Sequence, residues 1–314
     1  MILNTMTDKP SDNTAILLCT RNGENYLYDQ LSSYESQTYK NWSLWVSDDG
    51  STDTSRDIIA DFISQSGIRG YLLSGPQQGF CANFMSLVAN PEIQATYYAF
   101  SDQDDVWLDD KLARATQWLQ SIKADIPAVY CSRTRLTDST GAVKGFSPDH
   151  EKAPGFGNAL LQNIASGNTM VFNHSARELL RKAQGAPMVV HDWSLYQIVA
   201  GCGGAVFYDR QPTVLYRQHN NNVIGNGMSP LHRLQNFIAA HGGRTAQWND
   251  QNRQVLACVS ENLTPEAKQS LATFSAIRDN SVLNRLRLMR RSGIYHQQWI
   301  GSLTTLTYVL LNKI

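Results

Sequence analysis

Short apolar runs alternate with amphipathic stretches in the first part of the chain, from residue 15 to about residue 125. The apolar runs have the length of buried strands, and we expect strands at 15–19, 43–47, 71–73 and 96–101. The stretches between them repeat apolar residues at helical spacing, as in Leu27, Leu31 and Tyr34. This alternation predicts βαβ units, and therefore an α/β domain with a mostly parallel central sheet flanked by helices.

The order of elements becomes less regular after residue 125. We expect strands at 128–133 and 169–172 with a loop at 141–157 between them, a helix at 192–200, and a hairpin or sheet edge at 205–208 and 213–216. A Gly- and Asn-rich stretch at 220–229 indicates a boundary or a mobile loop, and the rest of the chain has a helical pattern. The expected units are a flexible N-terminus at 1–14, a main domain at 15–228 with halves 15–125 and 126–228, and a helical C-terminal appendage at 229–314.

Composition is that of an ordinary globular protein. The 314 residues are 42% hydrophobic and 17% charged, which is enough apolar material for a core. Lys plus Arg and Asp plus Glu both total 27, and this formal net charge of +0 argues against a protein that binds nucleic acid through bulk charge. The five cysteines form no Cys-x-x-Cys pair, which argues against a zinc site or a disulfide framework and favours a reducing cytoplasm.

Neither a signal peptide nor a membrane span is expected. The N-terminal residues lack a basic stretch followed by an apolar one. The longest apolar run, at 306–311, is far shorter than the roughly 20 residues that a membrane-spanning helix needs. The sequence therefore predicts a cytoplasmic protein that is soluble or lies on a surface.

An acidic cluster follows the predicted strand at 96–101. Asp102, Asp104 and Asp105 fall within four residues. In an extended segment Asp102 and Asp104 point to the same side, where their charges repel unless a cation lies between them. Mg²⁺ or Mn²⁺, which also binds diphosphate oxygens, satisfies that geometry. The alternative is a solvated turn in which Asp105 and Asp109 cap the next helix.

Two other strand ends carry polar side chains that suit a ligand. Asp48 and Asp49 follow an apolar strand, and one of them is placed to accept a hydrogen bond from a nucleobase, although an Asp-Gly turn with a helix cap explains the same residues. The segment 20–23 leads into a helix N-terminus, which suits phosphate or ribose. Ligands of α/β sheets collect beyond the carboxyl ends of the strands, so three such ends predict a binding cleft.

Seven segments together carry a likeness to a known family. They are ILLCTRNGENYL, VSDDGSTDTS, FSDQDDVWLDDKL, GFCANFMSL, SGNTMVFN, VHDWSLY and YRQHNNNVIG. This set resembles family 2 glycosyltransferases with the GT-A fold. The likeness covers residues 15 to about 226 and is greatest for bacterial rhamnosyltransferases of surface-polysaccharide assembly. It implies a GT-A-type, Rossmann-like catalytic domain with a donor half and an acceptor half. It also implies inverting, Mg²⁺- or Mn²⁺-dependent transfer, with dTDP-L-rhamnose favoured as donor and a saccharide or polyprenyl-diphosphate-linked glycan, such as an O-antigen intermediate, as acceptor.

The resemblance also assigns roles to individual residues. It places the donor nucleotide against Thr20, Arg21, Glu24, Asp49, Asn83, Asp102 and Gln103. It implies metal ligation by Asp102, Asp104 and His219. It implies acceptor or diphosphate contacts for Trp107, Asn168, His191, Trp193 and Arg217, although a turn that leads into a strand explains Asn168 nearly as well. Many members stack an aromatic residue on the base where this chain has Arg21.

Inversion at an anomeric carbon needs a carboxylate that takes the proton of the attacking hydroxyl. Asp192 lies at the start of a predicted helix, where a simple N-cap would also place an Asp. The resemblance aligns Asp192 with the catalytic carboxylate of the family, and His191 replaces the usual neighbouring acid. The flexible stretch at 220–227 is suited to close over the donor and exclude water.

The C-terminal region is basic and amphipathic. Five arginines lie between residues 278 and 291 against the single acid Asp279, and apolar residues interleave with them. Residues 294–314 are aromatic and apolar with almost no charge. Two interpretations remain open, namely peripheral binding to an anionic membrane surface and an ordinary helical pair that packs on the main domain or on a partner.

Two other functions are compatible with acidic strand ends. A sugar-phosphate nucleotidyltransferase also uses aspartates and Mg²⁺, but it usually carries a Gly-rich, basic loop after the first strand, where this chain has only Arg21-Asn22-Gly23. A saccharide-binding module that has lost catalysis is the second, and the presence of every acidic position argues against it.

Overall fold

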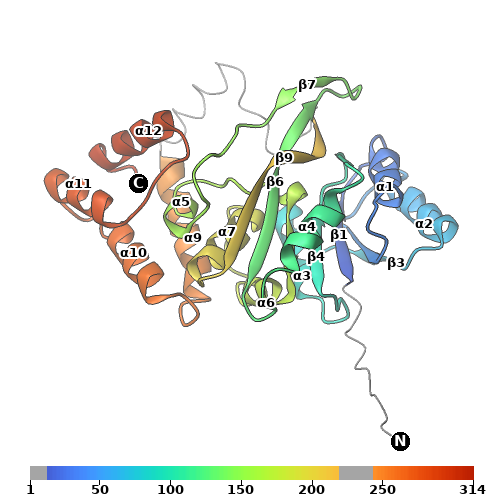
Figure 1. The fold of residues 1–314 in the computed structure, drawn as a ribbon, viewed down its shortest axis with the longest axis horizontal. Helices are drawn as coiled ribbons and strands as arrows, with labels where there is room; N and C mark the ends of the chain where they lie inside the picture. Colours follow the sequence, from blue (N-terminus) through green and yellow to red (C-terminus); the bar gives the residue numbers. More distant parts are fainter. Residues whose placement is uncertain (1–12, 219–242) are drawn as a thin grey trace, which may run out of the picture.

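The computed structural model describes residues 13–218 and 243–314. Within these residues a single nine-stranded sheet has helices on its faces, and the C-terminal helices extend to one end of the molecule (Figure 1). The strand order is β3-β2-β1-β4-β8-β6-β9-β5, with β7 paired to β6. The strands are β1 Thr14–Thr20, β2 Trp42–Asp48, β3 Gly70–Ser74, β4 Tyr97–Ser101, β5 Val106–Trp107, β6 Ala128–Thr137, β7 Val143–Phe146, β8 Val171–Asn173 and β9 Ala205–Arg217.

Four parallel strands form the first half of the sheet. Ile16 of β1 lies opposite Leu44 of β2 and Ala99 of β4, and all seven residues of β1 are buried. Such strands need apolar residues on both faces, which is why they appear in the sequence as continuous apolar runs. The flanking helices here are α1 Leu27–Glu35, α2 Ser55–Ser66 and α3 Phe80–Ala89. Because these strands are parallel, β1, β2 and β4 end at the same edge.

The second half of the sheet is mixed. β8 runs antiparallel to both β4 and β6, whereas β6 and β9 are parallel. The short strand β5 pairs with β9 and returns the segment after β4 to the sheet. The helices of this half are α4 Lys111–Leu119, α5 Phe156–Ala159, α6 His174–Arg181 and α7 His191–Gly201, with the 3₁₀ turn η1 at Gly167–Thr169.

Two expectations about this half need correction. Of the two alternatives for the segments 205–208 and 213–216, the hairpin is wrong, because both segments belong to β9, which runs parallel to β6 on either side of a stretch at 210–213 that has no partner in β6. The sheet edge is closer to the structure, since β9 lies next to β5 at the end of the strand order. The expected loop at 141–157 contains β7 and α5. In β7 the side chains of Val143 and Phe146 are exposed, so the strand lacks the apolar alternation that would reveal it.

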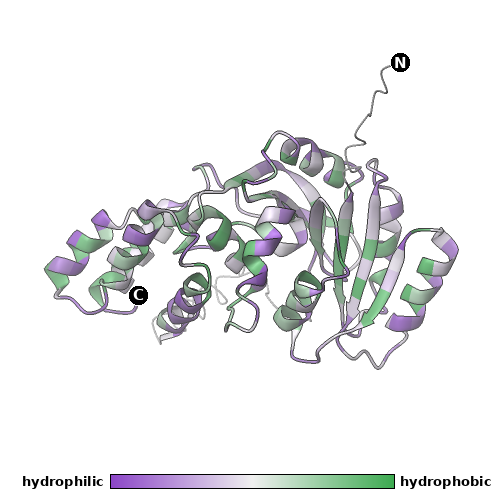
Figure 2. Cartoon of the chain, turned by 90° about the horizontal axis from the view of Figure 1, so that it is seen from below, coloured by the Kyte–Doolittle hydropathy of each residue, from purple (hydrophilic) through white to green (hydrophobic). Residues whose placement is uncertain are grey.

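Helices α9 Thr245–Ala257, α10 Pro265–Ser275, α11 Val282–Arg291 and α12 Trp299–Leu310 form the C-terminal region. Hydrophobic and hydrophilic residues interleave along these helices (Figure 2). None of the helices in the described part of the chain is long and apolar enough to cross a membrane. The division of the chain into domains at residue 228 stays a prediction, since that boundary lies outside the described residues.

A close backbone contact joins the C-terminal region to the sheet domain. The backbone N–H of Tyr295 donates to the carbonyl of Gly157 at 3.4 Å, and Asn158 Nδ2 donates to the carbonyl of Tyr295 at 3.1 Å. A Cβ atom on Gly157 would lie 2.1 Å from the carbonyl oxygen of Gly293. Only glycine allows the two segments to approach this closely.

We expect Gly157→Ala to destabilise the protein by about 2–3 kcal/mol, because the added methyl group collides with backbone rather than with a side chain that can move. Gly185→Ala is the matched control, since its φ of +84° strains alanine but its surroundings are open, and it should cost roughly 1 kcal/mol. Urea unfolding measures both. Equal losses for the two variants would contradict a close contact at Gly157.

Candidate active site

The carboxyl ends of β1, β2 and β4 bring the predicted donor-binding residues to one edge of the sheet. Thr20 ends β1 and pairs in register with Asp48, which ends β2. Ser101 ends β4 beside β1, and the acidic segment begins at the next residue. The polar strand ends that are separated in sequence therefore meet in space, as expected for an α/β sheet.

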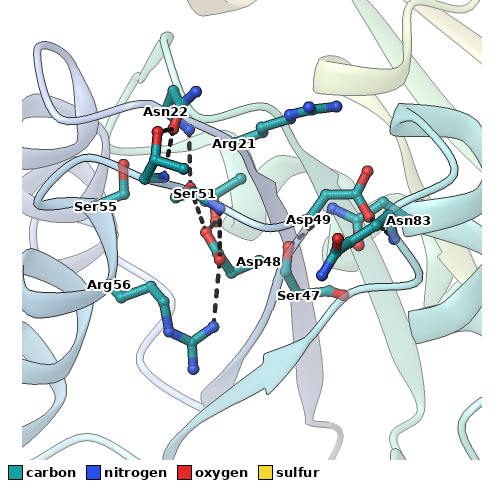
Figure 3. A network of polar contacts seen from close by, with 12 residues as sticks. Arg21, Asn22, Ser47, Asp48, Asp49, Ser51, Ser55, Arg56 and Asn83 are labelled. Carbon is teal, nitrogen blue, oxygen red and sulfur yellow. Dashed lines mark hydrogen bonds and ion pairs between the residues drawn. The ribbon is translucent and has the colours of Figure 1, made fainter.

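Asp48 is a structural residue at this edge. Its buried carboxylate accepts hydrogen bonds from Thr20 Oγ1 at 3.0 Å and from the backbone N–H of Ser51 at 3.1 Å, and Arg56 Nη1 lies 3.3 Å away (Figure 3). Burial alone would raise the pKa of Asp48, but these hydrogen bonds outweigh it and lower the pKa. Asp48 thus fastens the turn after β2 to the end of β1.

Asp49 and Asn83 lie side by side in the same region (Figure 3). Asp49 is 3% exposed, and its carboxylate accepts backbone hydrogen bonds from Gln77 at 2.6 Å and Gly79 at 3.1 Å. Asn83 Nδ2 donates to the carbonyl of Ser47 at 2.9 Å, while its buried Oδ1 has no hydrogen-bond partner among the described residues. Each carboxylate oxygen of Asp49 keeps a further lone pair, so both residues retain hydrogen-bonding capacity, although both side chains are buried in this structure.

Gln103 positions the loop that carries Arg21. Its side chain accepts from the backbone N–H of Arg21 at 2.8 Å and donates to the carbonyl of Arg21 at 3.1 Å. The Arg21 side chain extends away from the Asp48 cluster (Figure 3). Glu24, in contrast, accepts hydrogen bonds from the backbone N–H and the hydroxyl of Thr54, at the start of α2. Thus Gln103 and Glu24 hold the site's loops, whereas Arg21 is available to an anionic ligand.

Carboxylates crowd the segment that follows β4. Burial and the negative charges of Asp104 and Asp192 raise the pKa of Asp102 to about 8. Asp105 is completely buried, and burial together with the charges of Asp104 and Asp102 raises its pKa well above the usual value. The alternative in which Asp105 caps the next helix does not hold, because its oxygens accept from Asn168 Nδ2 at 2.6 Å and from the backbone N–H of Arg217 at 3.3 Å.

Lys111 is a buried residue that the sequence motifs did not identify as part of the site. Its Nζ atom donates to the carbonyl of Asn168 at 3.1 Å and lies 4.4 Å from the centre of the Trp107 ring. Burial lowers the pKa of Lys111 to about 7, against the opposing effect of Asp105. The sequence did indicate that Lys111 is buried, because it falls on the apolar stripe of its helix, four residues before Ala115.

The acidic segment fits a hard divalent cation whose remaining ligands come from a substrate. Among the described residues, no group of three or more His, Cys, Asp or Glu side chains could hold a metal unaided. Mg²⁺ typically binds through one or two carboxylates together with substrate phosphates, so Asp102 and Asp104 suffice on the protein side. Burial and then the charges of Asp104 and Asp192 raise the pKa of Asp102, and a cation would offset those charges. The predicted third ligand, His219, lies outside the described residues.

Asp192 lies in the first turn of α7, facing the 3₁₀ turn η1. The N-cap of α7 is Val190, so Asp192 is not the cap. Its two oxygens accept backbone hydrogen bonds from Gly167 at 2.8 Å and Trp193 at 2.6 Å, and Asn163 contributes a side-chain hydrogen bond. Despite these bonds, burial raises the pKa of Asp192 to about 6. This is a carboxylate that is charged at neutral pH but readily accepts a proton.

His191 is held in an aromatic environment beside Asp192. Its ring stacks on Phe84 at 4.0 Å and meets the ring of Phe100 edge-on at 4.6 Å. Burial lowers the pKa of His191 to about 3, so the imidazole is neutral at physiological pH. Neither ring nitrogen has a hydrogen-bond partner among the described residues, and a Cβ atom at Gly167 would lie 3.1 Å from Nε2.

The other residues predicted to contact the acceptor or the diphosphate make contacts within the protein. Trp107 is 1% exposed and packs in the core, so its ring offers no surface to an acceptor in this structure. Trp193 Nε1 donates to the carbonyl of Ala159 at 2.7 Å. The Arg217 guanidinium pairs with Asp29 at 2.7 Å. Together with Asn168, which joins Asp105 to Lys111, these residues fix the elements that carry the carboxylates.

Comparison with known proteins shows which family the chain resembles. The family model described as Glycosyl transferase family 2 matches residues 15–180. The chain is 30% identical to "dTDP-rhamnosyl transferase RfbG" of Shigella flexneri over 68% of this chain and 75% of that protein. It is 34% identical to "UDP-Glc:alpha-D-GlcNAc-diphosphoundecaprenol beta-1,3-glucosyltransferase WfgD" of Escherichia coli over 49% of this chain and 56% of that protein.

Two solved structures share the fold. The structure of S. aureus TarS 1-349 in complex with UDP-GlcNAc superposes with a TM-score of 0.54 at 13% identity and covers 90% of both chains. GalNAc-T7 with UDP, GalNAc and Mn²⁺ also gives a TM-score of 0.54, at 10% identity, over 94% of this chain and 57% of that chain. Both are GT-A glycosyltransferases, so the expected GT-A-type α/β fold is confirmed.

We expect Lys111→Met to destabilise the protein by about 3 kcal/mol, because it leaves the buried carbonyl of Asn168 without its donor and removes the electrostatic interaction between Lys111 and Asp105. Once Asp105→Asn has removed the carboxylate, Lys111→Met should cost at least about 1 kcal/mol less. A double-mutant cycle by urea unfolding measures the coupling. Lys123→Met, at an exposed position, is the control and should change stability by less than about 0.5 kcal/mol. Additive losses at residues 105 and 111 would show that the two do not interact.

Proposed function

The chain belongs to glycosyl transferase family 2, and we propose that it is an inverting, divalent-metal-dependent transferase that moves L-rhamnose from dTDP-rhamnose to a saccharide acceptor. The observation that carries this proposal is geometric: Asp102 follows the end of β4, and Gly167, whose backbone N–H bonds the Asp192 carboxylate, lies in the turn that leads into β8, the neighbour of β4. This arrangement supports a metal-binding carboxylate and a proton-accepting carboxylate that act in one site. The similarity to a dTDP-rhamnosyl transferase over most of both chains supports the donor.

In the proposed mechanism Asp102 and Asp104 hold Mg²⁺ or Mn²⁺, which offsets the negative charge of the departing nucleoside diphosphate. Asp49 and Asn83 form the wall against the nucleotide, and Arg21 adds positive charge from the loop after β1. GalNAc-T7, which shares the fold, was solved with UDP, GalNAc and Mn²⁺, and this supports a divalent cation beside a nucleoside diphosphate.

Asp192 is the proposed base. Its carboxylate takes the proton from the attacking acceptor hydroxyl, and the backbone N–H groups of Gly167 and Trp193 fix both of its oxygens. A pKa of about 6 leaves Asp192 ionised at neutral pH yet basic enough to accept a proton in the transition state. The low pKa of His191 keeps its ring neutral, so it adds no positive charge that would lower that basicity.

We further propose that the acceptor is a glycan linked to a polyprenyl diphosphate, in the assembly of a cell-surface polysaccharide such as O-antigen, on the inner face of the cytoplasmic membrane. The name of the Escherichia coli relative specifies a diphosphoundecaprenol-linked acceptor, which supports this class.

Two observations disfavour the two alternative functions, a sugar-phosphate nucleotidyltransferase and a saccharide-binding module without catalysis. The loop after β1 is fixed by Gln103 and has no glycine-rich cradle for a triphosphate, and every carboxylate that the chemistry needs is in place.

The function is tested by donor binding and transfer in Asp192→Asn. We expect dTDP to raise the melting temperature more than UDP or GDP and only with Mn²⁺ or Mg²⁺ present. Asp192→Asn should keep this stabilisation but reduce the transfer of rhamnose by about 10³-fold or more, because the amide cannot accept the proton. Thermal shift and a coupled release assay for dTDP measure the two quantities.

Asp61→Asn, at an exposed position of α2, is the control and should behave as the wild type. Full transfer activity of Asp192→Asn would remove Asp192 from the mechanism. Stabilisation by dTDP that does not depend on metal would contradict the role of Asp102 and Asp104.

The pH dependence of kcat gives a second test of the base. Protonation of Asp192 abolishes its function, so kcat should fall tenfold per pH unit on the acidic side of its pKa. Burial raises the pKa to about 6, and a bound cation lowers it, so the midpoint should lie at or below about 6 in the metal-loaded complex. A pH series at saturating donor and Mn²⁺ measures it, and an acidic midpoint above about pH 7 would contradict this assignment.

A further inference from the structure

Helices α11 and α12 expose most of the large apolar side chains at the surface of the described residues. Seven of the eleven exposed large hydrophobic residues lie between 282 and 311. The most exposed are Leu283 at 80% and Trp299 at 74%, followed by Leu311, Ile300 and Leu303 at 54–59%. A concentration of this kind is unusual for the free surface of a protein and indicates a binding surface.

The exposed residues of α12 form one stripe. Trp299, Leu303 and Leu310 are separated by four and seven residues, so they project from the same side of the helix. The buried residues of α12 are Thr305 and Val309, which face the protein. The apolar stripe is therefore additional to the side with which α12 packs, and no described residue covers it.

Positive charge accompanies this apolar surface. Residues 280–314 contain five basic residues and no acid, so the rest of the chain, with 22 basic residues against 27 acids, is net negative by five. On α11, Arg287, Arg290 and Arg291 share the exposed side with Leu283. Their guanidinium groups make no hydrogen bond or ion pair with any described residue, whereas Arg285 bonds the last carbonyls of α12. Three of the arginines are thus free to meet an external anion.

We propose that α11 and α12 form a docking surface for an anionic lipid bilayer, with the stripe of Trp299, Leu303 and Leu310 inserted at the interface and the arginines of α11 at the lipid headgroups. Tryptophan prefers the boundary between headgroups and acyl chains, and amphipathic helices that combine apolar and arginine-rich faces bind there. Each arginine near an anionic leaflet adds attraction that salt weakens.

A second copy of this chain fits the surface less well. A symmetric dimer would bring the arginines of both copies into one interface, and residues 280–314 contain no acid to pair with them. A bilayer supplies both the apolar layer and the negative charge that the surface lacks. The inference rests on the proposed lipid-linked acceptor for its biological purpose, but bilayer binding itself requires no catalysis.

Vesicle flotation with the full chain tests the proposal. Wild type should float with phosphatidylcholine vesicles that contain about 30% phosphatidylglycerol and should not float with phosphatidylcholine alone or at about 1 M NaCl. The triple variant Arg287→Ser, Arg290→Ser, Arg291→Ser should bind the anionic vesicles roughly 100-fold more weakly. The variant Trp299→Ser, Leu303→Ser should also lose binding, because it removes the inserted stripe.

The control Lys123→Ser, Lys144→Ser, Lys268→Ser changes the net charge equally at exposed positions elsewhere and should float as the wild type does. Thermal unfolding of each variant verifies that it is folded. Binding of either α11–α12 variant at the wild-type level would overturn the proposal. So would a wild type that fails to float but forms a dimer that Trp299→Ser, Leu303→Ser abolishes, because the surface would then join two copies.

The outcome is separable from that of the proposed function. Metal-dependent stabilisation by dTDP without flotation would refute the docking surface alone. Flotation by a protein that neither binds dTDP nor transfers rhamnose would refute the proposed function alone.

Discussion

Burial of several like charges in one region of the fold is the constraint on which the rest of the site depends. Burial, together with the negative charges of neighbouring carboxylates, raises the pKa values of Asp102 and Asp105: Asp104 acts on both, and Asp192 acts on Asp102. Like charges at close range in a poorly solvated environment are costly, and a fold keeps them only when other groups hold them in place. Here the backbone amides of η1 and β9, the side chain of Asn168 and the buried Lys111 do so.

Different surroundings give chemically identical side chains different functions. Asp48 accepts enough hydrogen bonds to lower its pKa, which suits a permanent structural anion. Asp192 receives fewer bonds relative to its burial and keeps a pKa of about 6, which suits a base. Asp105 is clamped by Asn168 and the backbone of β9, so it orders the acidic segment rather than meeting a ligand. Environment, more than residue type, decides which carboxylate reacts.

The sequence predicted those features that depend on local patterns. The strands β1, β2 and β4 and their polar ends were recognisable because strands buried on both faces need continuous apolar runs. The pairing of β9 with β6 and the burial of Lys111 were not, because both depend on residues far away in the chain. Likewise, the hydrogen bonds between the Gln103 side chain and the Arg21 backbone join two loops that are adjacent only after β4 has paired with β1. Trp107 and Trp193 look like ligand contacts beside motif residues, but their rings fill the interior.

The C-terminal region is more than an appendage, because it completes the packing around the proposed base. Ten of the eleven residues of α7 are buried, and a helix that is buried on nearly every side needs cover from more than the sheet. Trp248 of α9 provides part of that cover through an edge-on contact with Trp193, the residue after Asp192. The close contact at Gly157 fixes the segment between α11 and α12 to α5, which itself packs on α7. Contacts therefore connect the helices that we propose to dock on the bilayer with the helix that carries Asp192. Because of these contacts, docking would orient the proposed site relative to a lipid-linked acceptor.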